Sequence, residues 1–360
     1  MTTTGNTLAS AQRVDFGPGH TVLSSPGGRF SLRVQRRSII VCAIFAALGL
    51  VLALWALATG EITFSAIELL RALLGTGSSS SELVVLSWRL PRVVMALALG
   101  AALGISGAIF QSLTRNPLGS PDIIGFNTGA YTGALAVIFL AGGGYFQIAA
   151  GALLGGLLTA ALVYLLAYRR GSQGFRLIIV GIAFSAILAS LNTWLILRAG
   201  LEEAMSAAVW GAGSLNAMGW EHAQPALLAV TVFFIAAAML APRMHMLEMG
   251  DDAASALGIR VEPARLLLMV VGVGFTALAT AAAGPISFIA LAAPQVARRL
   301  TRSAGVRMGS SAILGAVLLL FSDLMAQRLV PETALPVGVV TVSVGGIYLI
   351  WLLLREAKRS

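Results

Sequence analysis

Long runs of apolar residues recur along most of the 360-residue chain and constrain its fold more than any other feature. A helix needs about 20 apolar residues to cross a bilayer, and fewer where it is broken or shielded by protein. Hydrophobic residues make up 58% of the chain and charged residues 11%, whereas soluble domains average about 45–50% and about 25%. We therefore predict an all-α polytopic membrane protein. Its ten expected spans are 39–59, 92–113, 124–141, 147–168, 176–198, 225–241, 264–283, 287–300, 310–329 and 337–354.

Lysine and arginine predict the orientation of these spans. If the N-terminus lies inside, the inner segments carry 19 of the 24 basic residues, as the positive-inside rule requires. Both termini are then cytoplasmic, and the family resemblance described below implies the inner membrane of a bacterium. The net charge of +9 reflects this topology and does not indicate nucleic-acid binding. The five basic residues expected outside are Arg71, Arg89, Arg92, Arg198 and Arg328.

The two ends of the chain differ from its apolar part. Residues 1–38 are polar and are expected to form a disordered cytoplasmic tail, followed by a permease domain at 39–354 and a short tail at 355–360. The first apolar run is longer than a signal-peptide core of about 7–15 residues. It is therefore interpreted as a retained helix, with a cleaved signal as the alternative. Cys42 is the only cysteine, which excludes an intramolecular disulfide and a cysteine-rich metal site.

A weak internal similarity suggests that the chain contains a repeat. The second span, GAALGISGAIFQSLTRNP, resembles GVGFTALATAAAGPISFIALAAP around the seventh and eighth spans. Spans 2–5 and 7–10 would start from opposite sides of the membrane, as in an inverted repeat.

Few residues in the spans can carry chemistry. The only lysine, Lys358, follows no glycine-rich loop, so the chain has no P-loop for ATP. Ser106, in GISG, resembles the nucleophile of an intramembrane protease, but the three histidines fall in the tail and loops, so packing is the favoured role. Asp323 lies inside a span, where a carboxylate suggests ion coupling. The alternatives are neutralisation by Arg328 and helix capping.

Four segments, in order over residues 89–354, share motifs with one family. They are RLPRVVMALALGAALGISGAIFQSLTRNPLGSPDIIGF, LEMGDDAASALGI, AGPISFIALAAPQVARRL and DLMAQRLVPETALPVGVVTVSVGGIYLIWLLL. In these segments the chain resembles the permease subunits of ABC importers for ferric siderophores, haem and cobalamin. Two of them are most similar to the catecholate-siderophore branch, of the ferric-enterobactin type.

The resemblance implies a type II ABC importer permease fold and a function without chemistry of its own. A second homologous permease, a different chain in the enterobactin type, would complete the path for a ferric siderophore. Two ATPase subunits would bind ATP and Mg²⁺, and an extracytoplasmic binding protein would deliver the substrate. This chain would bind no cofactor. Cobalamin or haem import is the alternative substrate assignment.

The resemblance also assigns three sets of site residues. Arginines at the outer surface would dock the binding protein: Arg89, Arg92 and Arg328. Polar and apolar loop residues would form the cytoplasmic gate: Asn116, Leu118, Ser172 and Gln173. The segment 247–259, expected to be a short amphipathic helix with Leu247, Ala254 and Leu257 packed on the membrane domain, would dock the ATPase through Leu247, Gly250, Asp251, Asp252, Ala254, Leu257 and Gly258.

Two departures from the family pattern are visible. Gln295 stands where the family usually has histidine after Pro294, and Gln327 stands where a third docking arginine is expected. Two rival functions remain open from the residues alone. One is an ion-coupled carrier that uses Asp323, which the docking segment argues against. The other is a protease that uses Ser106, which the absence of a histidine base argues against.

Overall fold

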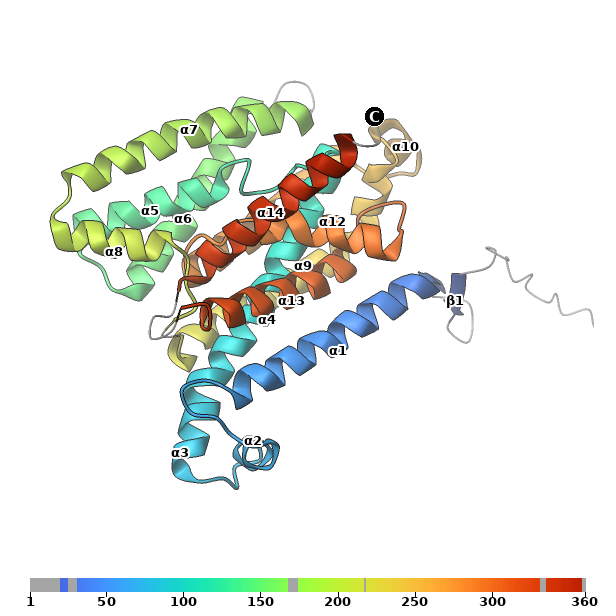
Figure 1. Ribbon diagram of the computed structural model, residues 1–360. Coiled ribbons are helices and arrows are strands. Elements are labelled where there is room, and N and C mark those ends of the chain that lie inside the picture. Colours follow the sequence, from blue (N-terminus) through green and yellow to red (C-terminus); the bar gives the residue numbers. More distant parts are fainter. Residues whose placement is uncertain (1–19, 25–30, 168–173, 217, 331–334, 358–360) are drawn as a thin grey trace, which may run out of the picture.

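The computed structural model describes residues 20–24, 31–167, 174–216, 218–330 and 335–357, and this part of the chain is almost entirely helical (Figure 1). The elements are β1 (His20–Ser24), β2 (Ser31–Gln35), α1 (Arg36–Ala58), α2 (Ala66–Leu73), α3 (Ser79–Glu82), η1 (Leu83–Arg89), α4 (Leu90–Thr114), α5 (Phe126–Ala141), α6 (Tyr145–Ala167), α7 (Gly174–Arg198), α8 (Leu201–Gly211), α9 (Trp220–Glu248), α10 (Asp251–Ala256), α11 (Val261–Ala283), α12 (Ile289–Thr301), α13 (Met308–Ala326) and α14 (Val337–Ala357).

A helix occupies each of the ten expected spans. Seven helices of the described chain are long and apolar enough to cross a membrane, and α5 and the first part of α14 are shorter apolar helices. At 13 residues, α12 is shorter than a full span. The multi-pass architecture is therefore confirmed, whereas the number of ten crossings stays a prediction.

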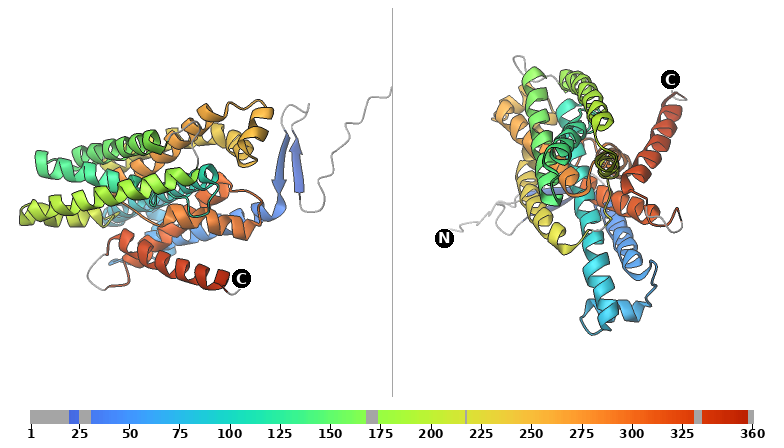
Figure 2. Two further views of the ribbon diagram at one scale, coloured as in Figure 1. Left: turned by 90° about the horizontal axis from the view of Figure 1, so that it is seen from above. Right: turned by 90° about the vertical axis from the view of Figure 1, so that its left-hand side faces the viewer.

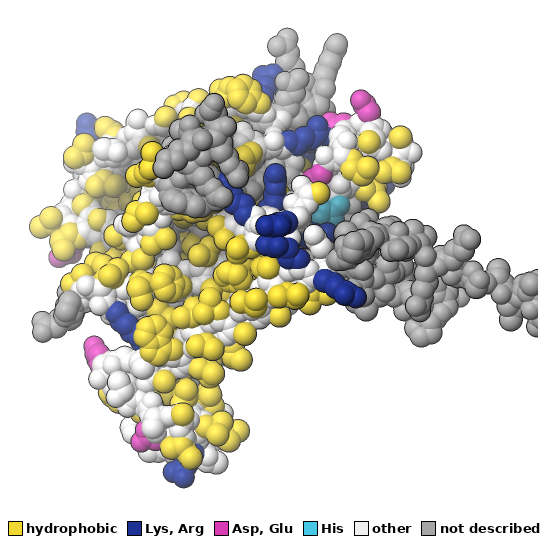
Figure 3. All heavy atoms as spheres, turned by 45° about the vertical axis from the view of Figure 1, so that its right-hand side comes forward, with side chains coloured by type: hydrophobic (Ala, Val, Ile, Leu, Met, Phe, Trp, Pro, Cys, Tyr) yellow, Lys and Arg dark blue, Asp and Glu magenta, His cyan; other side chains and the backbone are white. Residues whose placement is uncertain are grey.

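The bundle has two ends that carry different elements. The short helix α10 lies at one end, here called the α10 end, together with the last turns of α4, α9 and α12. The helices α2 and α3 lie at the other, here called the α2 end (Figure 1). The left view in Figure 2 shows most of the long helices lengthwise and roughly side by side, and the right view looks nearly along several of them. Apolar side chains cover much of the flank between them in Figure 3.

The helix α4 is, together with α11, among the most enclosed long helices of the described bundle, and its glycines explain why. A Cβ atom on Gly104 would meet the backbone carbonyl of Ser311 in α13, and one on Gly107 would meet the carbonyl of Ala290 in α12. Helices in lipid associate through such close backbone approach, because no hydrophobic drive acts between them. These glycines therefore let α4 form the centre of the core.

The second span begins earlier than the sequence suggested. A continuous helix runs from Ser79 to Thr114, so Arg89 and Arg92 lie within it and not at its start. Pro91 is accommodated because the preceding segment η1 is a π-helix, in which the Leu90 amide donates to the Val85 carbonyl five residues back. Arg89 ends this turn and Arg92 follows it in α4, and both bond to groups within the protein. Helical turns of the π type are frequent at functional sites.

The range expected to be a disordered tail contains regular structure in its described part. The strands β1 and β2 form an antiparallel hairpin, which projects from the bundle in Figure 2, and α1 begins at Arg36.

Candidate functional site

Arg92 and Asp323 join two helices near the α2 end. Arg92 donates from Nε to Asp323 Oδ2 at 2.9 Å and from Nη2 to Oδ1 at 2.8 Å. Gln327 Nε2 also donates to Oδ2, at 2.8 Å. The Asp323 side chain is 2% exposed and that of Arg92 18%. Three donors therefore satisfy the carboxylate that the sequence singled out, and its partner is Arg92 and not Arg328.

Arg89 and Arg328 make other contacts inside the same region. Arg89 donates from Nη1 to the Leu57 carbonyl at 2.8 Å and from Nη2 to the Ile62 carbonyl at 2.6 Å. Arg328 lies over the ring of Trp55, with 3.9 Å to its centroid, and donates to Thr59 Oγ1. All three arginines expected to dock a binding protein thus hold parts of their own chain together.

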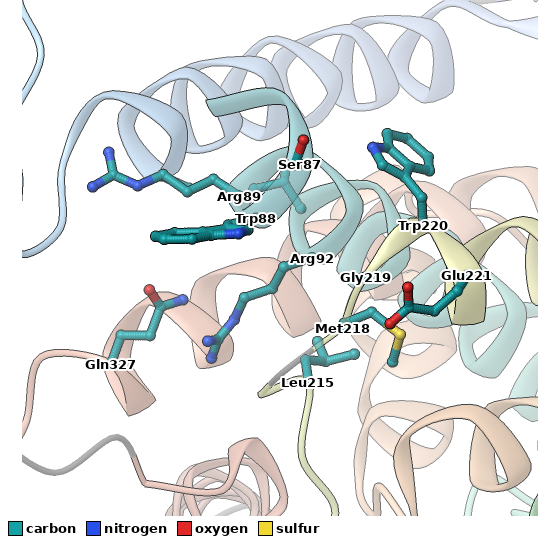
Figure 4. Close-up of a pocket in the computed structure, with 12 residues that line it drawn as sticks. Ser87, Trp88, Arg89, Arg92, Leu215, Met218, Gly219, Trp220, Glu221 and Gln327 are labelled. Atoms are coloured by element: carbon teal, nitrogen blue, oxygen red, sulfur yellow. The ribbon is translucent and has the colours of Figure 1, made fainter. Parts of the chain in front are cut away.

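Arg89 and Arg92 nevertheless line an open cavity of about 570 Å³ at the α2 end. Figure 4 shows the Arg92 side chain extending between Gln327 on one side and Glu221 on the other, whereas the guanidinium of Arg89 points away from them. The Glu221 side chain is 73% exposed. The cavity therefore presents both signs of charge, and a docking partner would meet Arg92 while it is held by Asp323.

The expected ATPase-docking segment is shorter and differently arranged than predicted. The helix α10 has only six residues, because Gly250 with φ of 112° separates it from α9 and Gly258 with φ of 82° follows its end. Leu247 belongs to α9 and is buried, as is Ala254. Leu257 is 58% exposed, so the expectation that it packs on the membrane domain is wrong. The turn at Gly258 directs it outward.

Asp251 connects this segment to two long helices. Arg115 Nη2 donates to Asp251 Oδ1 at 2.7 Å, and Arg265 Nη2 donates to Oδ1 and Oδ2 at 3.0 and 2.9 Å. Partial burial raises the pKa of the Asp251 carboxyl, but the hydrogen bonds and charges of Arg265 and Arg115 outweigh it and hold the pKa below its ordinary value. Asp251 is therefore an anion that ties α10 to the end of α4 and the start of α11.

Arg115 also begins the loop in which the gate was predicted. It ends α4 in the left-handed conformation with φ of 50°, and Asn116 follows it directly. Asn116 Oδ1 accepts from the Leu118 amide at 2.9 Å, which closes a tight turn and leaves the Leu118 side chain 48% exposed. The other two predicted gate residues, Ser172 and Gln173, lie outside the described residues.

Two further contacts hold this gate loop, here residues 115–122. Gln295 Nε2 in α12 donates to the Pro117 carbonyl at 2.7 Å. Asp122 accepts from Asn127 Nδ2 at 2.7 Å and from the Phe288 amide at 3.0 Å. The glutamine that departs from the family pattern thus contacts the loop directly.

Ser106 has a structural role. Its hydroxyl donates to the Gly272 carbonyl at 2.7 Å and lies 2.8 Å from Thr276 Oγ1, so it joins α4 to α11 in the core. Of the histidines whose side chains the structure describes, His222 lies against the ring of Tyr145 and His245 near Glu248. Neither bonds to Ser106, so these residues form no protease dyad.

Sequence reasoning missed Arg115, Gln295 and Asp122. Arg115 and Asp122 lie within the quoted motif around the gate, and Gln295 was noticed only as a departure. A signal was present for Arg115 and Asp122, because polar residues beside a proline-broken helix end must find partners. Apart from Asn127, which bonds to Asp122 from five positions away, the partners named above lie more than a hundred positions away.

Comparison with known proteins agrees with the fold and identifies the family. The model of the FecCD transport family matches residues 47–355. The chain belongs to this family, whose members among its relatives are permease proteins of transport systems, and it is therefore a transport component and not an enzyme.

Individual relatives cover nearly the whole chain. It is 52% identical to the ferric enterobactin transport system permease protein FepG of Escherichia coli (strain K12). The aligned 327 residues cover 91% of this chain and 99% of that protein. It is 34% identical to the iron(3+)-hydroxamate import system permease protein FhuG of Bacillus subtilis (strain 168), covering 89% and 98%. A solved inward-facing metal-chelate type ABC transporter matches with a TM-score of 0.75 and 25% identity, covering 88% of this chain and 99% of that one.

Proposed function

We propose that this permease forms half of the translocation path of an ATP-driven importer of ferric siderophore, of the catecholate type. The observation that carries this proposal is the 52% identity to the ferric enterobactin permease over 99% of its length. The second half of the path would be a homologous but different permease. The alternative is import of haem or cobalamin, in which the permease would have the same role and only the transported ligand would differ.

The α10 end would face the cytoplasm. Helix ends rich in arginine gather there, including Arg298 and Arg299 at the end of α12 and Arg37, whose Nε donates to the Leu300 carbonyl at 2.8 Å. Basic residues favour the cytoplasmic side. Two ATPase subunits, which would hold ATP and Mg²⁺, would then dock on the segment 247–259, where exposed Leu257 supplies an apolar contact. The N-terminus and C-terminus would both be cytoplasmic in the bacterial inner membrane.

The α2 end would receive the extracytoplasmic binding protein. Arg89, Arg92 and Arg328 lie at this end, and Arg92 keeps its Nη1 free of described hydrogen bonds. A carboxylate of the binding protein could therefore add to the Arg92–Asp323 pair without displacing it. This form of docking uses a guanidinium that is already oriented, which lowers the entropy lost on binding.

Coupling between the two partners would pass through Arg115. The Asp251–Arg115 ion pair joins the docking segment to the gate loop, in which Asn116 and Leu118 would form the constriction. Ser172 and Gln173 would contribute the second part of the gate. A displacement of α10 by the ATPase would then act on the residue directly before the gate.

The test is uptake by the complete importer in vesicles. The permease, its partner permease, the ATPase and the binding protein are reconstituted, and import of iron bound to a catecholate siderophore is compared with import of a hydroxamate chelate, haem and cobalamin. Preferential ATP-dependent import of the catecholate supports the proposal. Import of haem or cobalamin with no iron-siderophore uptake would overturn it. An importer with an inactive ATPase is the control.

A further inference from the structure

Two apolar helices of the described chain, α5 and α12, are too short to cross a bilayer by themselves. They have 16 and 13 residues. At about 1.5 Å per residue these helices are about 24 and about 20 Å long, whereas the hydrocarbon core is about 30 Å thick. Each one follows a longer helix after a break, at 115–125 after α4 and at 284–288 after α11. Backbone in such breaks must find its hydrogen-bond partners inside the protein.

Asp122 connects the starts of these two short helices. Its Oδ1 accepts from Asn127 Nδ2, in the first turn of α5, at 2.7 Å, and its Oδ2 accepts from the Phe288 amide, directly before α12, at 3.0 Å. Asn127 is held in turn, because its Oδ1 accepts from Thr280 Oγ1 in α11 at 3.0 Å. Negative charge is stabilised near a helix N-terminus, and here one carboxylate lies at the N-termini of two helices.

Phe288 has a backbone conformation that residues other than glycine rarely adopt. Its φ is 80° and its ψ is −34°. Arg115 and Arg302, the other described non-glycine residues with positive φ, end helices in the ordinary left-handed conformation. A conformation like that of Phe288 is costly and persists only where the surroundings hold it. The hydrogen bond from its amide to Asp122 is one of the contacts that do so.

The ring of Phe288 provides another contact, with α14. A Cβ atom on Gly345 would overlap this ring, so only glycine lets α14 approach it so closely. The ring of Tyr348, also in α14, lies edge-on to it with 5.9 Å between centroids. The helix α14 lies beside α12 in Figure 1 and contacts it. Phe288 therefore bonds to the gate loop through its backbone and packs against α14 through its side chain.

The gate loop is attached to α12 at a second point. Gln295 Nε2 donates to the Pro117 carbonyl at 2.7 Å, near the start of the loop, whereas Asp122 lies at its end. Two attachments fix the position of the loop relative to α12, so a displacement of the loop also displaces the Phe288 ring. Closely packed interiors have low compressibility and transmit strain, so the ring pressed against Gly345 passes this displacement to α14.

We propose that Asp122 and Phe288 form a latch that makes the gate loop and α14 move as one unit during transport. Both are positioning residues, because they act on the gate loop and α14 and not on the transported ligand. This inference rests on the proposed function only in assuming that the gate loop changes position during the transport cycle. It does not depend on which chelate is imported.

The first experiment tests the carboxylate of the latch. Asp122→Asn places an amide nitrogen against the Asn127 amide, so one hydrogen bond is lost. Adding Asn127→Asp restores that bond with carboxylate and amide exchanged. In the reconstituted importer we expect Asp122→Asn to lower the number of chelates imported per ATP about tenfold, the effect of one hydrogen bond to a charged group. The exchange variant should recover most of this loss, and an exchange variant no better than Asp122→Asn would contradict the latch.

The second experiment tests the ring and decides the question if Asp122→Asn does not reach the membrane. Phe288→Ala keeps the amide bond to Asp122 and removes the contact with Gly345. It should lower import per ATP while the membrane level and the rate of ATP hydrolysis stay unchanged. Phe321→Ala is the matched control, because Phe321 is 41% exposed on α13, and it should match the wild type. Wild-type import per ATP by Phe288→Ala would overturn the latch.

A distance measurement separates this inference from the proposed function, because it needs ATP but no transported ligand. In a Cys42→Ser background, nitroxide labels on Leu118→Cys and Ile347→Cys report the distance from the gate loop to α14. Labels on Leu118→Cys and Ile44→Cys report the distance from the loop to α1, and all three positions are exposed. Between the nucleotide-free and the ATP-bound importer, we expect the loop–α1 distance to change and the loop–α14 distance to stay constant. With Phe288→Ala the loop–α14 distance should change as well.

Three outcomes of this measurement would overturn the latch. They are a loop–α14 distance that changes while Phe288 is intact, one that stays constant in Phe288→Ala, and a loop–α1 distance that does not respond to ATP. Failure of the wild type to import ferric siderophore would overturn the proposed function alone, because the two distances are measured without it.

Discussion

Arg92 and Asp323 form an ion pair with a buried carboxylate and a partly buried guanidinium through two hydrogen bonds, although 231 positions separate them in the sequence. The pair locks α4 to α13 next to the cavity at the α2 end. It also changes what a charge reversal at Arg92 would do, because a glutamate there would face the Asp323 carboxylate. A test of docking must therefore separate recognition from folding.

The first prediction concerns the stability of this pair. Removing one partner of a buried pair leaves an uncompensated charge, which costs about 3–5 kcal/mol. We expect Arg92→Gln and Asp323→Asn each to lower the thermal unfolding temperature of the purified permease, and the double variant to be more stable than their effects added together. Additive losses would show that the two residues act independently.

The second prediction concerns docking at the same arginine. If Arg92 Nη1 contacts a carboxylate of the binding protein, the Arg92→Gln, Asp323→Asn double variant should bind the binding protein about tenfold more weakly. Its stability change is measured in parallel. The single Asp323→Asn variant keeps the guanidinium and serves as the control. Equal affinity of both variants for the binding protein would remove Arg92 from the docking surface.

The third prediction concerns the exposed leucine beside α10. Leu257→Arg places a charge where an apolar contact is expected, and we predict that the ATPase no longer co-purifies while the permease still inserts into the membrane. Leu74→Arg is the matched control, because Leu74 is 68% exposed at the opposite end of the bundle. Retention of the ATPase by Leu257→Arg would contradict the assignment.

The fourth prediction concerns coupling through Arg115. We expect Arg115→Gln to preserve ATPase binding and ATP hydrolysis but to lower the number of chelates imported per ATP. Asp251 and Arg115 are about half exposed, with 47% and 51% of their side chains accessible, so high salt should lower this ratio in the wild type as well. A variant with unchanged coupling would show that the pair only stabilises the loop.

The same pair predicts a pH dependence. The folded-state pKa of Asp251 lies below its ordinary value, so its stabilisation is present above the unfolded-state value of about 3.9 and is lost only as the pH falls through the lower folded-state value. Coupling in the wild type should therefore stay constant between about pH 5.5 and 8. A decline across that window, measured in vesicles, would assign the loss to another group.

The fifth prediction concerns the gate loop. In a Cys42→Ser background, Leu118→Cys should crosslink to the partner permease, with a yield that depends on the nucleotide bound to the ATPase. Gly119→Cys is the contrasting position, because Gly119 is buried beside Thr114 and the Asn116 carbonyl. Labelling of Leu118→Cys only by lipid-phase reagents would place the residue away from the path.

The sequence alone determined the class of protein, because the length of an apolar run is a local property, and the thickness of the bilayer sets how long a run must be to cross it. Helices occupy all ten expected ranges, and the four motif segments predicted the family that the comparisons confirm. The sequence also singles out Asn116 and Asp251 as candidates for the gate and for ATPase docking, since one follows a helix end broken by proline and the other lies in an acidic turn flanked by glycine.

Only the tertiary structure decided which groups meet. The sequence offered Arg328 as the partner of Asp323, but the π-helical turn before Pro91 brings Arg92 there and leaves Arg328 over Trp55. It offered Leu257 as a packing residue, but the positive φ at Gly258 accompanies a turn that leaves it exposed. Ion pairs, close helix contacts and the bond from the Phe288 amide to Asp122 all depend on residues distant in the chain, so their arrangement exists only once the helices have packed.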